Sequence, residues 1–250
     1  MCNPQTQRCE EKIFQLQPAA DNSEPDDGGL LTDDGGFSKF DAACGTVQVQ
    51  ATLIKSPADI IMIIDNSGSM TSEITAVQEN INNSLAKVLA NAGLDYRVIL
   101  ISKHGSASAD QSICISMPLA GNASCNPAPV KPTFATHFFH YSVEIASTNS
   151  LNLILSTYAQ ADSLGLAPTG WQAWLRPNAA KTFIEVTDDN HSSAYTATTF
   201  DTALLALSPT QFGTPAQRNY LFHSMIGVQE NTIATEPYPA TAAFVTTKCA

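Results

Sequence analysis

Short apolar segments alternate along the chain with longer amphipathic ones. Residues 59–65, Asp-Ile-Ile-Met-Ile-Ile-Asp, are apolar between their ends and have the length of a strand buried on both faces. Apolar positions recur at helical spacing over 74–88, and Gly93 then ends the helix. By the same criteria we predict strands at 96–102, 138–145, 181–187 and 221–228, helices at 151–158 and 200–207, and a half-buried edge strand at 47–53.

The repeated alternation of strands and helices predicts an α/β fold. We expect a doubly wound, mostly parallel sheet with helices on both faces. This domain should span residues 45–250. Residues 1–44 are predicted to be a largely disordered tether, because 21–41 are acidic, rich in glycine and poor in aliphatic side chains.

The composition narrows the classes of partner. Hydrophobic residues make up 44% of the 250 residues, which is enough for a folded core. The net charge of −11 argues against binding to nucleic acid or to anionic membrane surfaces, since both require basic patches. No apolar run approaches the roughly 20 residues of a membrane-spanning helix.

The six cysteines suggest an oxidising environment. Cys114 and Cys125 bracket a Pro- and Gly-containing stretch, which predicts a local disulfide, whereas six unpaired cytosolic thiols are the alternative. We therefore expect a secreted, periplasmic or outer-surface protein. The first 20 residues lack the apolar core of a signal peptide, and Cys2 after Met1 suggests a lipid anchor at the N-terminus.

The polar residues after the first central strand have the pattern of a cation site. Asp65, Ser67 and Ser69 alternate across Gly68, which is expected to permit the bend, and their oxygens should converge. A carboxylate with two hydroxyls is a hard donor set, suited to Mg²⁺ first and to Mn²⁺ or Ca²⁺ as alternatives.

The stretch Asp-Ile-Ile-Met-Ile-Ile-Asp-Asn-Ser-Gly-Ser-Met, with the helix after it, resembles the von Willebrand factor type A (vWA) family, especially exported bacterial lipoprotein-type members. The resemblance implies a metal-ion-dependent adhesion site at Asp65, Ser67 and Ser69. It also implies a ligand at Asp188, since Lys-Thr-Phe-Ile-Glu-Val-Thr-Asp-Asp is similar to the family strand that ends in Thr-Asp-Gly. Asp189 replaces that glycine and is expected to face water.

The resemblance also implies a threonine ligand from another loop. Thr148 is the first choice, followed by Ser147 and Thr169, and Thr148 could equally be the N-cap of the next helix. The resemblance covers about 54–228. The family usually ends with one more strand and helix, which residues after Val228 do not show, so the domain is expected to lack them or to pack differently there.

The function implied is adhesion: a protein partner would contribute a carboxylate to the bound cation, and no enzymatic activity is expected. Two alternatives are a purely structural extracytoplasmic domain and a metal-assisted hydrolase using His191. A zinc site is a further alternative, with four candidate ligands: Cys114, Cys125, His137 and His140. Trp171 and Trp174 are expected to pack in the core.

Overall fold

The computed structural model describes residues 57–106, 111–189 and 195–227. The predicted tether at 1–44 and the predicted edge strand at 47–53 lie outside these ranges, as do His191 and everything after residue 227. In the described part, no helix is long and apolar enough to cross a membrane.

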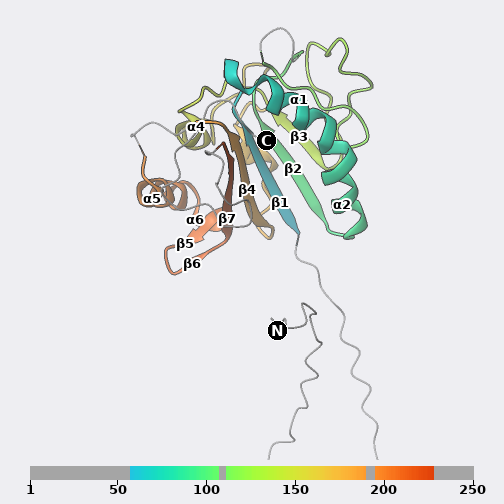
Figure 1. The fold of residues 1–250 in the computed structure, drawn as a ribbon. Coiled ribbons are helices and arrows are strands. Elements are labelled where there is room, and N and C mark those ends of the chain that lie inside the picture. Colours follow the sequence, from blue (N-terminus) through green and yellow to red (C-terminus); the bar gives the residue numbers. More distant parts are fainter. Residues whose placement is uncertain (1–56, 107–110, 190–194, 228–250) are drawn as a thin grey trace, which may run out of the picture. The chain divides into compact units, whose positions relative to one another are not determined.

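The fold is built on a five-stranded sheet in which all strands are parallel (Figure 1). Its strand order is β3-β2-β1-β4-β7. The bounds are Ala58–Ile64 for β1, Tyr96–Ile101 for β2, Phe138–Tyr141 for β3, Ala180–Thr187 for β4 and Tyr220–Ile226 for β7. The predicted α/β fold with a parallel sheet is confirmed at this level.

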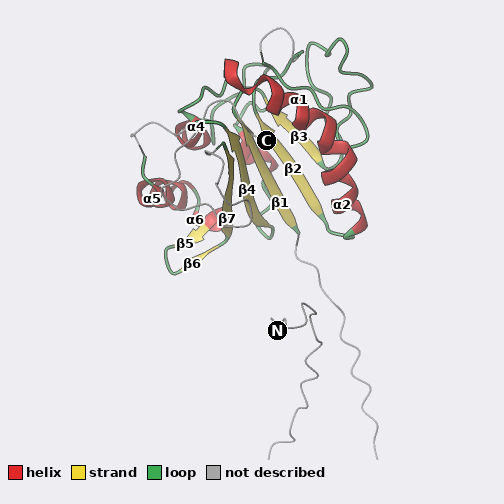
Figure 2. Cartoon of the chain, in the orientation of Figure 1, coloured by secondary structure: helices red, strands yellow, loops and turns green. Residues whose placement is uncertain are grey.

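Helices cover both faces of the sheet, as predicted (Figure 2). Ile61 and Ile63 of β1 contribute to one apolar cluster, while Ile60, Met62 and Ile64 contribute to the other, because successive side chains of a strand point to opposite faces. The second cluster is covered by α1 (Thr71–Asn80), η2 (Ile81–Leu85) and α2 (Ala86–Asn91). The first is covered by α4 (Ser150–Ser156), η3 (Trp171–Trp174), α5 (Ala197–Leu207) and α6 (Pro209–Phe212).

The single helix predicted over 74–88 is interrupted. The five residues of η2 form a π-helical turn between α1 and α2. Within this turn the Asn82 side-chain amide donates to the Ser116 carbonyl at 3.0 Å and accepts from the Leu119 N–H at 3.0 Å. The π-helical turn thus contains a side chain that is hydrogen-bonded to a distant segment. The spacing of apolar residues alone does not predict such a turn.

Two further predictions concern the packing around the sheet. Trp171 and Trp174 are buried, as predicted, and both belong to η3. The strand predicted over 138–145 is too long, since β3 ends at Tyr141. The hairpin of β5 (Gly213–Thr214) and β6 (Gln217–Arg218) has no counterpart among the predicted elements.

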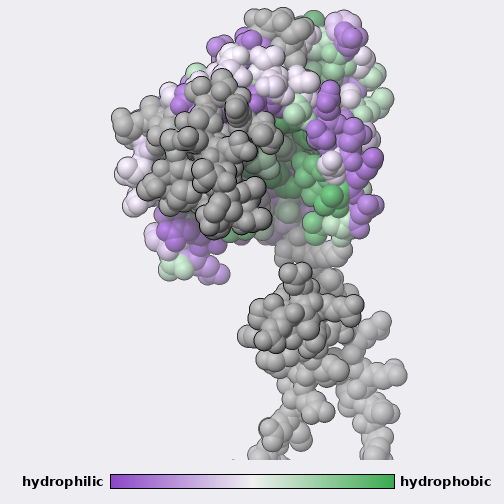
Figure 3. Space-filling model, in the orientation of Figure 1, coloured by the Kyte–Doolittle hydropathy of each residue, from purple (hydrophilic) through white to green (hydrophobic). Residues whose placement is uncertain are grey.

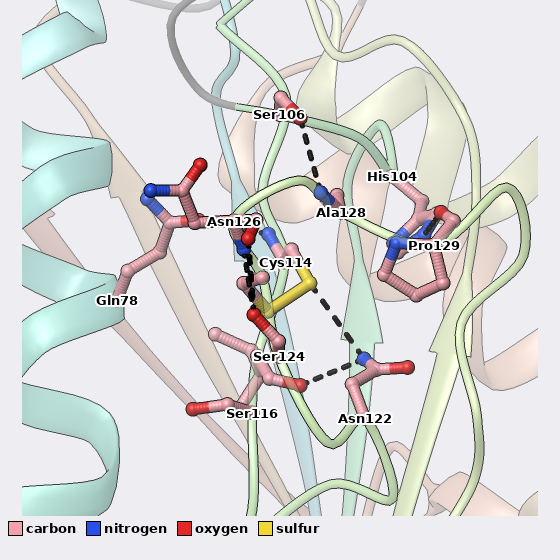
Figure 4. Close-up of a disulfide and its surroundings, with 12 residues drawn as sticks. Gln78, His104, Ser106, Cys114, Ser116, Asn122, Ser124, Asn126, Ala128 and Pro129 are labelled. Atoms are coloured by element: carbon pink, nitrogen blue, oxygen red, sulfur yellow. Dashed lines mark hydrogen bonds between the residues drawn. A yellow bond between two sulfur atoms is a disulfide. The ribbon is translucent and has the colours of Figure 1, made fainter.

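The predicted disulfide between Cys114 and Cys125 is present (Figure 4). It closes a loop that packs against the α1 side of the molecule, where the Gln78 side chain accepts a hydrogen bond from the Cys114 N–H at 2.9 Å. Figure 3 shows hydrophilic residues gathered over the outer side of α1, η2 and α2, with hydrophobic residues beside them toward the sheet.

Candidate functional site

The candidate site lies where the strand order reverses. From β1 the chain proceeds to β2 and β3 on one side of the sheet and then crosses to β4 and β7 on the other. Asp65 directly follows β1 and Asp188 directly follows β4, so the two neighbouring strands bring both acids to the same edge. In parallel α/β sheets this is the usual place for a binding site.

Direct hydrogen bonds join the ends of these two strands. The Asp65 N–H donates to the Val186 carbonyl at 2.9 Å. The Thr187 hydroxyl donates to Oδ2 of Asp65 at 2.8 Å, across 122 residues of sequence. Thr187 is thus a positioning residue for Asp65 that the sequence did not single out.

The turn after β1 brings the two predicted serines together. Oδ1 of Asp65 accepts from the Ser67 N–H at 2.8 Å, which folds the turn back on the carboxylate. The Ser67 and Ser69 hydroxyl oxygens are 3.4 Å apart. Ser67 is the N-cap of η1 (Gly68–Met70), yet its side chain makes no capping bond, so its hydroxyl is available to a ligand.

The expectation that the conformational freedom of Gly68 permits the bend is wrong. The residue does not have a positive φ, and a Cβ added to it would meet nothing within 4 Å. The turn is instead held by the Asp65 carboxylate and by the Met70 N–H, which donates to the Ser67 carbonyl at 3.1 Å. Any L-residue could adopt this backbone.

Asp188 is the most unusual residue of the site. Its side chain is buried, with 1% of the residue exposed, and neither carboxylate oxygen has a hydrogen-bond partner. Burial raises the pKa of Asp188; the nearby Ser69 hydroxyl opposes this shift, and the charges of Asp65 and Glu73 add to it. A buried carboxylate without a partner is costly, so a bound cation would relieve a real electrostatic penalty here.

Three buried acids share this region. Asp65 is 1% exposed and Glu73, in the first turn of α1, is 9% exposed. Glu73 accepts a hydrogen bond from the Ser72 hydroxyl at 2.9 Å. Among the described residues, no lysine or arginine forms an ion pair with any of the three. The local charge is therefore negative and favours a cation.

A third loop is tied to the site by Asn66. The Asn66 N–H donates to the Ile145 carbonyl at 2.9 Å, and Oδ1 of Asn66 accepts from the Ile145 N–H at 2.6 Å. This reciprocal pair ties the loop of residues 142–149, which we call the tethered loop, to the turn after β1. It also explains the burial of Asn66, which is 4% exposed and was not a candidate at the sequence level.

Of the three candidate loop ligands, Thr148 and Ser147 lie in this tethered loop. Ser147 is half-buried and Thr148 is exposed. The N-cap of α4 is Asn149, so the capping role considered for Thr148 is wrong. Thr169 lies at the other end of α4. The tethered loop leads into the N-terminal end of this helix, whereas Gly170, the residue after Thr169, packs against the Tyr158 backbone just beyond the C-terminal end.

The donor set fits a hard divalent cation. It combines the Asp65 and Asp188 carboxylates with the Ser67 and Ser69 hydroxyls, all oxygen, as Mg²⁺, Mn²⁺ and Ca²⁺ prefer. No group of three or more His, Cys, Asp or Glu side chains that could hold a metal occurs within the described residues. Any cation here would therefore depend on hydroxyls and water beside the carboxylates. Asp189 is half-buried, and its N–H donates to the Thr187 hydroxyl at 3.2 Å.

The alternative zinc site is not formed. Its two cysteines, Cys114 and Cys125, are joined as a disulfide and so cannot act as thiolate ligands. His137 lies beside Tyr96, and Nδ1 of His137 is 3.0 Å from the Tyr96 carbonyl oxygen. His140 instead contacts a different histidine, His104.

Comparison of the chain with protein-family models, curated proteins and solved structures found no match.

Proposed function

We propose that this domain is a vWA-like binding module that holds one divalent cation at the reversal point of its sheet. Asp65, Ser67, Ser69 and Asp188 would bind the ion directly or through water, and Thr148 would approach from the tethered loop. Mg²⁺ is the first choice, with Mn²⁺ and Ca²⁺ as alternatives, because all the donors are hard oxygens.

One observation carries the proposal: the buried Asp188 carboxylate, whose oxygens no hydrogen bond of good geometry satisfies, lies near the buried Asp65 carboxylate and near the Ser69 hydroxyl. A domain whose only role was structural would gain from an amide or an apolar residue at this position. The acid is better explained as a ligand, because a cation would offset the desolvation of both carboxylates.

The proposed partner is a protein that contributes a carboxylate to an open position on the cation. This part of the proposal rests first on the resemblance to the vWA family. The overall charge of −11 also suits it, because an acidic protein would repel an acidic partner group unless a cation lay between them. Binding, not catalysis, is proposed. In the described part of the chain, the Ser67 and Ser69 hydroxyls have no histidine as a hydrogen-bond partner to activate them.

An extracytoplasmic location is proposed with this function. The Cys114–Cys125 disulfide is compatible with it, since such bonds persist outside the reducing cytosol. A lipid anchor at Cys2 remains part of the proposal.

The cation site is tested by isothermal titration with Mg²⁺, Mn²⁺ and Ca²⁺. Wild-type protein should bind one ion, Asp65→Ala should bind none, and Ser69→Ala should bind at least tenfold more weakly. Ser69 is exposed, so its substitution should leave the fold intact even if loss of Asp65 does not.

Asp189→Asn is the matched control, because this half-buried residue neighbours Asp188 but is not among the proposed ligands. The affinity of this variant should stay within about twofold of wild type, which is about 0.4 kcal/mol. Equal affinity in all four proteins, or no binding by the wild type, would overturn the cation site. The partner is tested separately with immobilised aspartate- and glutamate-bearing peptides, whose retention should require Mg²⁺ and disappear with a chelator.

A further inference from the structure

A second group of buried polar atoms lies at the C-terminal ends of β2 and β3. Three of its atoms have no hydrogen-bond partner: Oγ of Ser102, Nδ1 of His104 and Nδ1 of His140. Ser102 and His140 are fully buried, and His104 is half-buried. Unsatisfied polar atoms are rare in protein interiors, so three in one place call for an explanation.

The three residues are in direct contact. Nε2 of His140 is 3.0 Å from the Ser102 carbonyl oxygen, and the His104 and His140 rings meet edge to face with their centres 5.2 Å apart. His140 follows Phe138 by two residues on β3, so it points to the same face of the sheet, toward α1. None of these side chains belongs to the cation site proposed above.

The hydrogen bonds determine which ring nitrogens carry protons. Nε2 of His104 is 2.8 Å from the carbonyl oxygen of Pro129, which follows Cys125 of the disulfide by four residues (Figure 4). A carbonyl can only accept, so both Nε2 atoms carry the hydrogen and both Nδ1 atoms carry a free lone pair. Metal-binding histidines show this same arrangement, with the non-ligating N–H donated to a carbonyl.

Burial keeps both rings in the neutral form that binds metals. It lowers the pKa of His140 to about 3, with the charge of His104 adding to the shift and the Ser102 backbone opposing it. It also lowers the pKa of His104, against the opposing effect of the Pro129 and Ile113 backbone. The ring separation fits as well: two imidazoles that share one tetrahedral ion at Zn–N distances of about 2.0–2.1 Å have their centres about 5 Å apart.

We propose that Nδ1 of His104 and Nδ1 of His140 together bind one Zn²⁺ ion, with the Ser102 hydroxyl and water completing its shell. Imidazole nitrogen favours this borderline metal over the hard cations expected at Asp65. With two histidine ligands, the site should bind less tightly than structural zinc sites with four protein ligands. It would link the ends of β2 and β3 through Pro129 to the segment that follows the disulfide.

The test is calorimetric titration of the full chain with Zn²⁺, after alkylation of free thiols and with saturating Mg²⁺ to occupy the proposed cation site. Wild-type protein should bind one ion that His104→Gln weakens at least tenfold. His140→Gln should do the same, and because His104 is only half-buried, the first variant remains informative if the second fails to fold.

His137→Gln is the matched control, since His137 is an exposed histidine that immediately precedes β3 and also contacts a backbone carbonyl. It should bind Zn²⁺ like the wild type. Co²⁺ should give the visible absorption of a tetrahedral nitrogen-bound ion in the wild type and the His137 variant only. Equal Zn²⁺ affinity in all these proteins, or no binding in the wild type, would overturn the proposal and assign the three polar atoms to buried water.

Discussion

Asp188 is the residue that most strongly supports the proposed cation site, whose other members are common residues. Serines after a strand are frequent, and the Ser67–Ser69 contact alone would be an ordinary turn. The carboxylate of Asp188 differs because the fold buries it, denies it hydrogen bonds and places it near a second buried acid. Without a cation, this arrangement destabilises the folded state.

Replacing Asp188 with asparagine should therefore have two opposite effects. In the absence of metal, the Asp188→Asn protein should be more stable than the wild type by about 1 kcal/mol, since a neutral amide costs less to bury than an unpaired carboxylate. In saturating Mg²⁺ the order should reverse, because only the wild type gains stability from binding.

Thermal unfolding with Mg²⁺ and with a chelator measures both effects. Asp189→Asn again serves as the control and should keep the wild-type response to Mg²⁺. If Asp188→Asn were less stable than the wild type in the chelator, the carboxylate would have a structural role that does not involve a cation.

At the scale of elements, the helix after β1 is held to the disulfide-closed loop by its π-helical turn. Asn82 bonds the backbone of that loop at two points, Ser116 and Leu119, which are 34 and 37 residues away. The next residue, Asn83, is exposed, and among the described residues its side chain bonds the Glu79 carbonyl one turn earlier. These neighbours have the same chemistry but different roles.

Asn82→Ala should consequently destabilise the protein by about 1–3 kcal/mol, because it leaves the Leu119 N–H and the Ser116 carbonyl without their partner. Asn83→Ala should change stability by less than about 0.5 kcal/mol, as is usual for exposed positions. Urea unfolding followed by circular dichroism compares the two. Similar losses in both variants would show that the turn does not anchor the loop.

At the scale of the whole molecule, an ion pair secures the outer part of the sheet. Asp201 of α5 accepts hydrogen bonds from Nε and Nη2 of Arg218, both at 2.7 Å, and from the Tyr220 hydroxyl at the start of β7. The bonds from Arg218 and then Tyr220 lower the pKa of Asp201 from 3.8 to about 2. The shift is produced by contacts between elements, so it exists only in the folded state.

This shift predicts how stability depends on acid. At about pH 5 and higher, well above the pKa of 3.8 in the unfolded chain, Asp201 is ionised in both states and the interaction contributes its full stability. As the pH falls from about 4 to 2, the unfolded state takes up a proton first, so the contribution is lost over that range.

Urea unfolding at pH 5 and pH 2.5 should show a smaller acid-induced loss for Arg218→Gln than for the wild type. Part of the effect should be screened by salt, because the pair is near the surface. An identical loss in both proteins would mean that other carboxylates dominate the acid response.

Local patterns in the sequence determined much of this protein. Apolar runs located the strands β1, β2, β4 and β7 to within one or two residues. For β1 the reason is that a strand buried on both faces must be apolar along its length, whereas β7 is largely exposed. The spacing of Asp65, Ser67 and Ser69 placed them in one turn, and the short separation of Cys114 and Cys125 predicted their disulfide.

Only the tertiary structure decided which distant residues meet. Three contacts depend on which strands are neighbours in the sheet: Thr187 with Asp65, Asn66 with Ile145, and His104 with His140. The alternation of residues along one strand does not predict which strand lies next to it. The burial of Asp188 without a hydrogen-bond partner belongs to this group as well. The sequence could identify Asp188 as a candidate ligand. Only the packing around Asp188 buries its charge, and this burial is the physical reason for proposing a cation there.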